Sequence, residues 1–136
     1  MATPPDPDAR KALLDMQEEV WLFVQEKGWD DNRSFGDAVA LMHSEVSEGL
    51  EEFRDHGLKR YVEDPTGFPY TQIHYLEDQE DYPDGLKPEG VPSEYADQLI
   101  RLLHNCKKDN VNLYSEFRAK MDYNWTRAYR HGGKAL

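Results

Sequence analysis

The sequence has a single cysteine, Cys106, among its 136 residues. One thiol within an apolar run excludes a disulfide framework and a cysteine-rich zinc site, and it indicates a reducing compartment. The sequence also lacks a hydrophobic stretch long enough to span a membrane, and its first residues have neither the basic nor the apolar region of a secretion signal. We therefore expect a cytoplasmic protein with no membrane partner.

Positive charge is scarce. The chain has 16 lysines and arginines against 27 aspartates and glutamates, which gives a formal net charge of −11. A nucleic acid or an anionic membrane would be repelled at long range, so neither is expected as a partner. A small anionic ligand such as a nucleotide is still compatible with this charge, because a divalent cation held by acidic side chains reverses the local field.

Apolar residues recur at helical spacing in four segments, and the length is that of one ordinary domain with a single core. We expect one domain over residues 1–136, with an all-α, four-helix bundle-like fold. The helices are expected from Asp6-Pro7 to Gly28, from the Ser34/Asp37 capping box to Gly57, from Pro92 through Cys106, and from Asn110 or Asn112 toward the C-terminus. The predicted inward stripes are Leu13, Met16, Val20, Phe23 and Val24; Val39, Met42, Val46, Leu50 and Phe53; Tyr95, Ala96, Leu99, Ile100, Leu103 and Cys106; and Leu113, Phe117, Met121 and Trp125.

Residues 58–90 interrupt this periodicity with four prolines, several glycines and the acidic run YLEDQEDYPDG. They predict a long irregular insertion between the second and third helices, in which only Thr71 to Leu76 has the character of a short strand or hairpin arm. Loops of this length are uncommon inside compact domains. A solvated surface excursion, a lid and an oligomer contact are all compatible with the composition.

Acidic residues form the most informative pattern. The second helix carries four glutamates between residues 45 and 52, with no basic residue among them. Glu45 and Glu48 are about one turn apart, so their like charges project in similar directions and repel each other. Glu94 and Asp97 repeat this spacing on the third helix. If the two helices pack side by side, two carboxylate pairs face each other.

Carboxylates that converge without a counter-charge either stay solvated or bind a cation, because burial of one unpaired charge costs several kcal/mol. Oxygen ligands without histidine or cysteine suit Mg²⁺, Mn²⁺ or Ca²⁺ rather than Zn²⁺. The alternative is a solvated helix face in which Asp97 pairs with Arg101 one turn later. A di-iron carboxylate bundle is disfavoured, since no histidine follows a glutamate by three positions.

The segments HSEVSEGLEEFRDHG and GVPSEYADQLIRLL, followed by the tail YNWTRAYRHGGK, together resemble the MazG-like nucleotide pyrophosphohydrolases of the all-α NTP pyrophosphatase superfamily. That family carries Glu-Glu-x-x-Glu on one helix and Glu-x-x-Asp on a later one, and these acids bind Mg²⁺. Ser44 stands where many members have the first glutamate, and the insertion 58–90 replaces a connection that is often short. The resemblance implies that Mg²⁺, with Mn²⁺ as a substitute, is bound by the catalytic residues Glu45, Glu48, Glu94 and Asp97.

The resemblance further implies a MazG-type fold and hydrolysis of a nucleoside triphosphate between its α and β phosphates, which gives the monophosphate and pyrophosphate. The expected partners are a small-molecule nucleotide substrate and further copies of the chain in a homodimer or homotetramer. Two alternatives stay open. One is a narrower dUTP or dCTP pyrophosphatase, and the other is a non-catalytic helical module with a solvated acidic face, whose tyrosine-rich loop binds a protein.

A polyphosphate chain needs cationic partners beyond the metal, and arginine binds phosphate with two parallel hydrogen bonds. Lys59 and Arg60, just past the second helix, are candidates, and the resemblance of the tail favours Asn124 and Arg127. Trp29 can stack on a base, with packing as its alternative role. The substrate-binding residues that we expect are Arg101, Asn124, Arg127, Arg130, Lys134 and Trp29.

Overall fold

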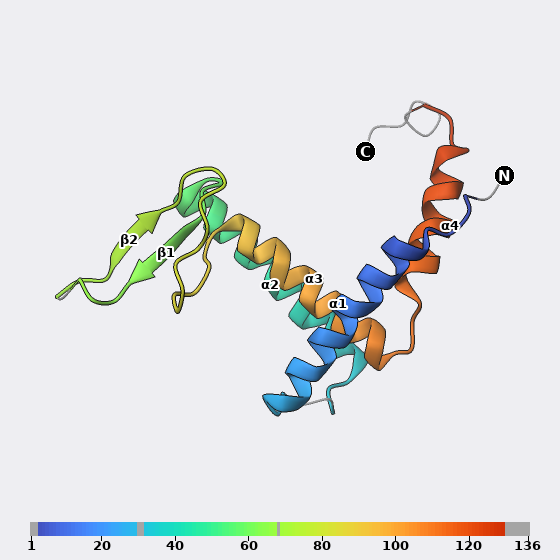
Figure 1. The fold of residues 1–136 in the computed structure, drawn as a ribbon, viewed down its shortest axis with the longest axis horizontal. Helices are drawn as coiled ribbons and strands as arrows, with labels where there is room; N and C mark the ends of the chain where they lie inside the picture. Colours follow the sequence, from blue (N-terminus) through green and yellow to red (C-terminus); the bar gives the residue numbers. More distant parts are fainter. Residues whose placement is uncertain (1–2, 30–31, 68, 130–136) are drawn as a thin grey trace. The chain divides into compact units, whose positions relative to one another are not determined.

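The computed structural model describes residues 3–29, 32–67 and 69–129, which form four helices and one two-stranded sheet (Figure 1). The mostly helical content agrees with the expected all-α class. Among the described helices, none combines the length and the apolar character that crossing a membrane requires. The helices are α1 (Pro7–Glu26), α2 (Phe35–His56), α3 (Val91–Lys108) and α4 (Leu113–Trp125), and the strands are β1 (Tyr61–Asp64) and β2 (Gln72–Tyr75).

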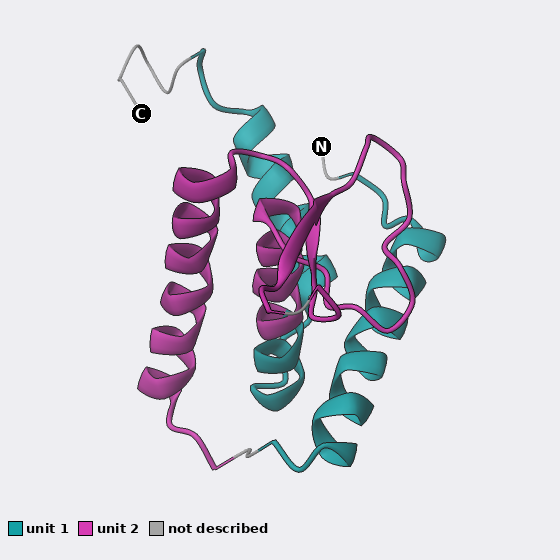
Figure 2. Ribbon diagram, turned by 90° about the vertical axis from the view of Figure 1, so that its left-hand side faces the viewer, with its two compact units in different colours: residues 1–29, 103–136 teal, residues 30–102 magenta. Residues whose placement is uncertain are grey.

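The chain divides into two compact units, coloured separately in Figure 2. The terminal unit comprises residues 1–29 and 103–136, and the central unit comprises residues 30–102. The central unit contains α2, both strands and the first part of α3, whereas α1, α4 and the end of α3 belong to the terminal unit. All four acids predicted to bind metal therefore lie in the central unit.

The helix ends follow the local signals of the sequence. Asp6, Ser34 and Asn112 each accept backbone N–H bonds at the starts of α1, α2 and α4. Asp37 completes the capping box of α2 by bonding back to the backbone of Ser34. Gly57 ends α2 with a φ of 62°, a conformation that glycine adopts without steric cost. These predicted ends are confirmed because each depends on neighbours only a few residues away.

Helices α2 and α3 run side by side and antiparallel in the central unit (Figures 1 and 2). Gly49 of α2 is buried, and a Cβ built on it would lie 3.7 Å from the Cβ of Glu94. One turn earlier in α2, Glu45 contacts Arg101, which lies further along α3. A Cβ at position 49 would thus be in ordinary van der Waals contact with Glu94, so the two helices pack against each other at this level.

The predicted apolar stripe of α2 does not form the core of the central unit. Val46, Leu50 and Phe53 are 56%, 50% and 53% exposed, whereas Glu45 and Gly49 are buried. The helix turns its Glu45/Gly49 side toward α3, so the prediction that its apolar stripe faces inward was wrong. Other large apolar side chains from the predicted stripes are also exposed: Met16, Phe23, Val39, Tyr95, Leu99, Ile100, Phe117 and Trp125.

The buried apolar residues lie elsewhere in the two units. In the central unit they gather where the sheet meets the start of α3, and in the terminal unit they come from α1, α3 and α4. The central set is Tyr61, Val62, Leu76 and Val91, and the terminal set is Val24, Leu103, Cys106 and Tyr114.

The insertion is more regular than its composition predicts. β1 and β2 pair antiparallel, from Tyr61 opposite Tyr75 to Asp64 opposite Gln72. The strand expected within Thr71 to Leu76 is confirmed, but its partner β1 was missed. Tyr61 and Val62 are both buried, so β1 lacks the alternation of buried and exposed residues by which a strand is recognised.

The two ends of the insertion are tied together next to α3. Tyr61 and Glu89 exchange backbone hydrogen bonds of 3.2 and 3.0 Å. Gly90 follows with a φ of 107°, and a Cβ at this position would overlap the carbonyl oxygen of Lys59. Glycine is therefore required where the chain closes the insertion and enters α3. This closure places residues 59–61 and 87–90 close to the predicted acids of α3.

Candidate metal centre

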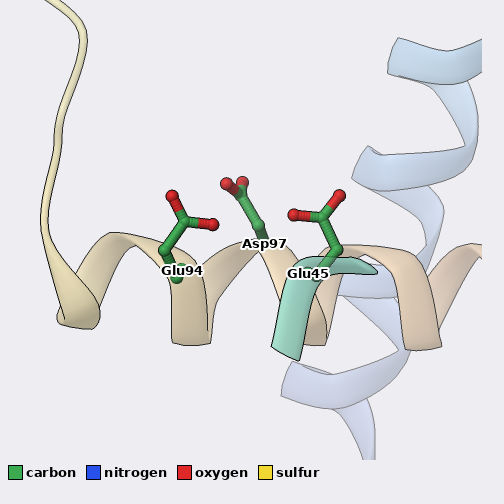
Figure 3. Close-up of side chains that lie close together, drawn as sticks. All are labelled: Glu45, Glu94 and Asp97. Atoms are coloured by element: carbon green, nitrogen blue, oxygen red, sulfur yellow. The ribbon is translucent and has the colours of Figure 1, made fainter. Parts of the chain in front are cut away.

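Three of the predicted acids form a compact cluster. One carboxylate oxygen from each of Glu45, Glu94 and Asp97 lies within 4.8 Å of the other two. Glu94 and Asp97 rise from the same side of α3 because they are three residues apart, and Glu45 joins them from α2 (Figure 3). The side-by-side packing of the two helices thus brings the carboxylates together as the sequence predicts.

The cluster is not a solvated helix face. Glu45 is 8% exposed and Glu94 is 7% exposed. The Oε2 atom of Glu94 is fully buried and has no hydrogen-bond partner among the described residues. A buried carboxylate oxygen without a donor is costly unless the group is protonated or accepts a cation. Three oxygen donors with one of them unpartnered fit a hard divalent cation.

Two acids of the cluster, Glu94 and Asp97, hold their protons more tightly than usual because their pKa values are raised. Burial, followed by the charges of Asp97 and Glu48, raises the pKa of Glu94 from its usual 4.5 to about 7. Burial and the nearby charge of Glu45 raise the pKa of Asp97, although Lys87 and Arg101 oppose this rise. Without a cation, the cluster therefore carries more negative charge than its surroundings stabilise.

Glu48 belongs to the same neighbourhood, but its side chain is on the exposed side of α2. Partial desolvation of its carboxyl group, followed by the charge of Glu45, raises the pKa of Glu48. Glu94 and Asp97 also act on this carboxyl group. All four acids predicted from the sequence therefore interact electrostatically, with Glu48 nearest to solvent.

Arg101 also lies in the cluster, where its Nε atom donates a hydrogen bond of 2.6 Å to Oε1 of Glu45. The sequence predicts Arg101 as a substrate-binding residue, or alternatively as a partner of Asp97. In the structure it forms an ion pair between α3 and α2 and is only 27% exposed. Arg101 thus compensates the charge of Glu45 and holds its carboxylate in place.

A second group of acids shares Glu94. One carboxylate oxygen from each of Glu52, Glu89 and Glu94 lies within 4.8 Å of the other two. The hydroxyl group of Tyr61 donates to Glu52 at 2.8 Å, and Lys87 approaches Glu89 at 3.3 Å. The sequence did not single out Glu89, which lies in the non-periodic insertion and reaches the cluster only through the closure at Gly90.

The other predicted substrate-binding residues belong to the terminal unit or are outside the described residues. Trp29 packs edge-on against Phe23 with ring centroids 4.9 Å apart, and Arg127 lies over the ring of Tyr123; both contacts are within the terminal unit. Asn124 is exposed near the end of α4. Arg130 and Lys134 are outside the described residues. Substrate binding by these five residues stays a prediction.

No protein-family model, curated protein or solved structure matches the chain. The geometry of the acidic cluster and the sequence motifs are therefore the basis for a functional proposal.

Proposed function

We propose that the protein is a metal-dependent nucleoside triphosphate pyrophosphohydrolase that cleaves between the α and β phosphates. The observation that supports this proposal is the buried Oε2 atom of Glu94, which has no hydrogen-bond partner among the residues that the structure describes. A carboxylate oxygen of the same residue lies within 4.8 Å of carboxylate oxygens of Glu45 and Asp97. Together with Glu48, these acids would hold Mg²⁺, with Mn²⁺ as a substitute. A bound Mg²⁺ supplies Lewis-acid chemistry, because it polarises phosphate oxygens and makes a nearby water molecule more acidic.

The side chains of the protein have distinct roles in this proposal. Arg101 orients the carboxylate of Glu45 through their 2.6 Å hydrogen bond. Glu48 is outside the three-acid cluster, faces solvent and has a raised pKa, so it is the acid best placed to accept a proton from the attacking water. The water oxygen bonds to the α phosphorus, the bond from that phosphorus to the bridging oxygen breaks, and pyrophosphate leaves with this oxygen.

Incubation of the purified protein with millimolar Mg²⁺ and a panel of nucleoside triphosphates tests this function directly. We expect equal amounts of nucleoside monophosphate and pyrophosphate, because a single anhydride bond is cleaved. Pyrophosphate and phosphate are to be measured separately, with dUTP and dCTP in the panel. Turnover of only these two nucleotides would select the narrower enzyme, whereas release of phosphate alone, or of neither product, would contradict the proposed function.

We also propose that the protein assembles as a homodimer or homotetramer. The support is the exposed apolar side of α2, formed by Val46, Leu50 and Phe53, which the rest of the central unit does not cover. Burial of this side between copies would remove apolar surface from water. We expect Leu50→Glu to shift the molar mass measured by light scattering toward the monomer, while Glu51→Gln leaves it unchanged. A monomeric wild-type protein would refute the assembly.

A further inference from the structure

A cavity of about 430 Å³ lies entirely within the central unit. The insertion supplies one part of its lining and the first turns of α3 supply the other. Asp97, a member of the acidic cluster, is among the lining residues. The cavity is within the size range of small-molecule sites and opens beside the residues proposed to bind metal.

The lining combines an apolar wall with two cationic side chains. Pro88 and Ile100 belong to the apolar part, and the ring of Tyr82 adds an aromatic surface. Arg60 and Lys87 are the cations, and both come from the insertion. Ligand sites usually have this composition, in which apolar surface contributes contact area and a few polar groups determine orientation.

Contacts within the insertion hold Arg60 in position. Its Nη2 atom donates a 2.8 Å hydrogen bond to the backbone carbonyl of Glu77, and its guanidinium lies 5.2 Å from the ring centroid of Tyr82. A guanidinium carries five N–H donors, so the bond to Glu77 orients the group without exhausting its donors. Arg60 and Tyr82 therefore form one preorganised part of the lining.

Lys87 connects the cavity with the acids. Its Nζ atom lies 3.3 Å from Oε1 of Glu89, and its side chain is 77% exposed. The charges of Glu94 and Asp97 also act on Lys87. Its flexible ammonium group can thus exchange or share its contact with Glu89 when a stronger anion enters.

A phosphate chain that approaches the acidic cluster meets repulsion from a protein whose formal net charge is −11. Cations in the same cavity as Asp97 offset this repulsion at the place where the phosphates must lie. Arg60 offers planar, two-pronged phosphate contacts, and Lys87 offers a mobile point charge. The aromatic and apolar part of the lining suits the sugar and base of a nucleotide.

We propose that this cavity binds the nucleotide, with its phosphate chain against Arg60 and Lys87 and its nucleoside along Tyr82 and the apolar wall. The inference rests on the proposed function and extends it, because it assigns substrate recognition to the insertion 58–90. Asp97 then marks the end of the cavity where the reacting phosphate meets the acidic cluster.

The test uses the full chain, Mg²⁺ and an α,β-methylene nucleoside triphosphate, which resists cleavage at the proposed bond. We expect Lys87→Gln and Arg60→Lys each to weaken binding of this probe about tenfold by calorimetry, since each removes one phosphate contact. Arg54→Gln is the matched control: it removes a positive charge from an exposed residue of α2 in the same unit, and Arg54 does not line the cavity. Binding by this control is expected to stay within about twofold of the wild type.

Two further measurements distinguish substrate binding from a structural role. With a cleavable nucleotide, KM is expected to rise about tenfold in both variants while kcat changes less than about threefold. The affinity for Mn²⁺ alone and the helical circular dichroism are expected to stay at wild-type values. If Arg60→Lys perturbs folding because the contact with Glu77 is lost, the probe affinity and KM of Lys87→Gln test nucleotide binding in the cavity.

Failure of the cavity and failure of the proposed function give different results. Pyrophosphate release by the wild type, with both cavity variants indistinguishable from Arg54→Gln, would refute nucleotide binding in the cavity and leave the proposed function intact. If the probe binds in a way that depends on Lys87 but no nucleotide releases pyrophosphate, nucleotide binding in the cavity is supported and the proposed function is refuted. If the wild-type protein does not bind the probe, the proposal that the cavity binds the nucleotide is refuted.

Discussion

Glu48→Gln and Asp97→Asn are each expected to lower the rate of pyrophosphate release roughly a thousandfold, the equivalent of about 4 kcal/mol of transition-state stabilisation. Both substitutions keep the size of the side chain and remove its negative charge. Asp97 belongs to the cluster with Glu45 and Glu94, so its substitution removes one of the proposed cation ligands. Substitution of Glu48 removes the proposed proton acceptor. Rates are to be compared at saturating Mg²⁺ and nucleotide.

Glu51→Gln is the control for these two variants. Glu51 is an exposed residue of the same helix as Glu48 and is not in either acidic group. The same change of charge is therefore expected to leave the rate within about twofold of the wild type. All three variants should keep the helical circular dichroism of the wild type. Wild-type rates in both Glu48→Gln and Asp97→Asn would refute the proposed roles of these acids.

In the absence of divalent cations, the protein is expected to lose stability as the pH rises from about 5 to 8. The pKa of Glu94 is about 7 in the folded protein and close to 4.5 when the chain is unfolded. The unfolded state therefore releases this proton first, so the stabilisation is complete below pH 4.5 and is lost as the pH passes 7. This shift corresponds to roughly 3 kcal/mol at most, or about 10 °C in melting temperature.

Other carboxyl groups do not reverse this direction. The raised pKa values of Asp97 and Glu48 change stability with the same sign as Glu94. Hydrogen bonds from Thr66 and Thr3 lower the pKa values of Asp64 and Asp122. Because these two exposed groups ionise below their usual range, the stability linked to them changes only at more acidic pH. Among these carboxyl groups, the change in stability between pH 5 and 8 therefore comes from the acidic cluster.

Mg²⁺ is expected to raise the melting temperature more at pH 8 than at pH 5, because a cation binds the ionised carboxylates and competes with protons. Glu94→Gln should raise the metal-free melting temperature at pH 8 and remove most of its pH dependence, whereas Glu51→Gln should do neither. Thermal melts with a chelator and with millimolar Mg²⁺ measure both effects. A metal-free melting temperature that rises from pH 5 to pH 8, or a melting temperature that does not change when Mg²⁺ is added, would contradict a cation site at the cluster.

The helices and the acidic pairs could be predicted from the sequence because their signals are local. Asp6, Ser34 and Gly57 determine helix ends through bonds to backbone groups within a few residues. The spacing of three between Glu94 and Asp97 places both carboxylates on one side of α3 in any context where that helix forms. Metal binding by these acids and the activity of the protein are still predictions.

The sequence by itself determined where the helices begin and end and which acids share a helix face. Only the tertiary structure decided that α2 buries Glu45 and Gly49 instead of its apolar stripe, since periodicity defines a face but not the surface that packs against it. It also decided that Arg60 and Lys87, far apart in the insertion, share a cavity with Asp97. That arrangement depends on the backbone closure between Tyr61 and Glu89, and no local pattern encodes a contact across 28 residues.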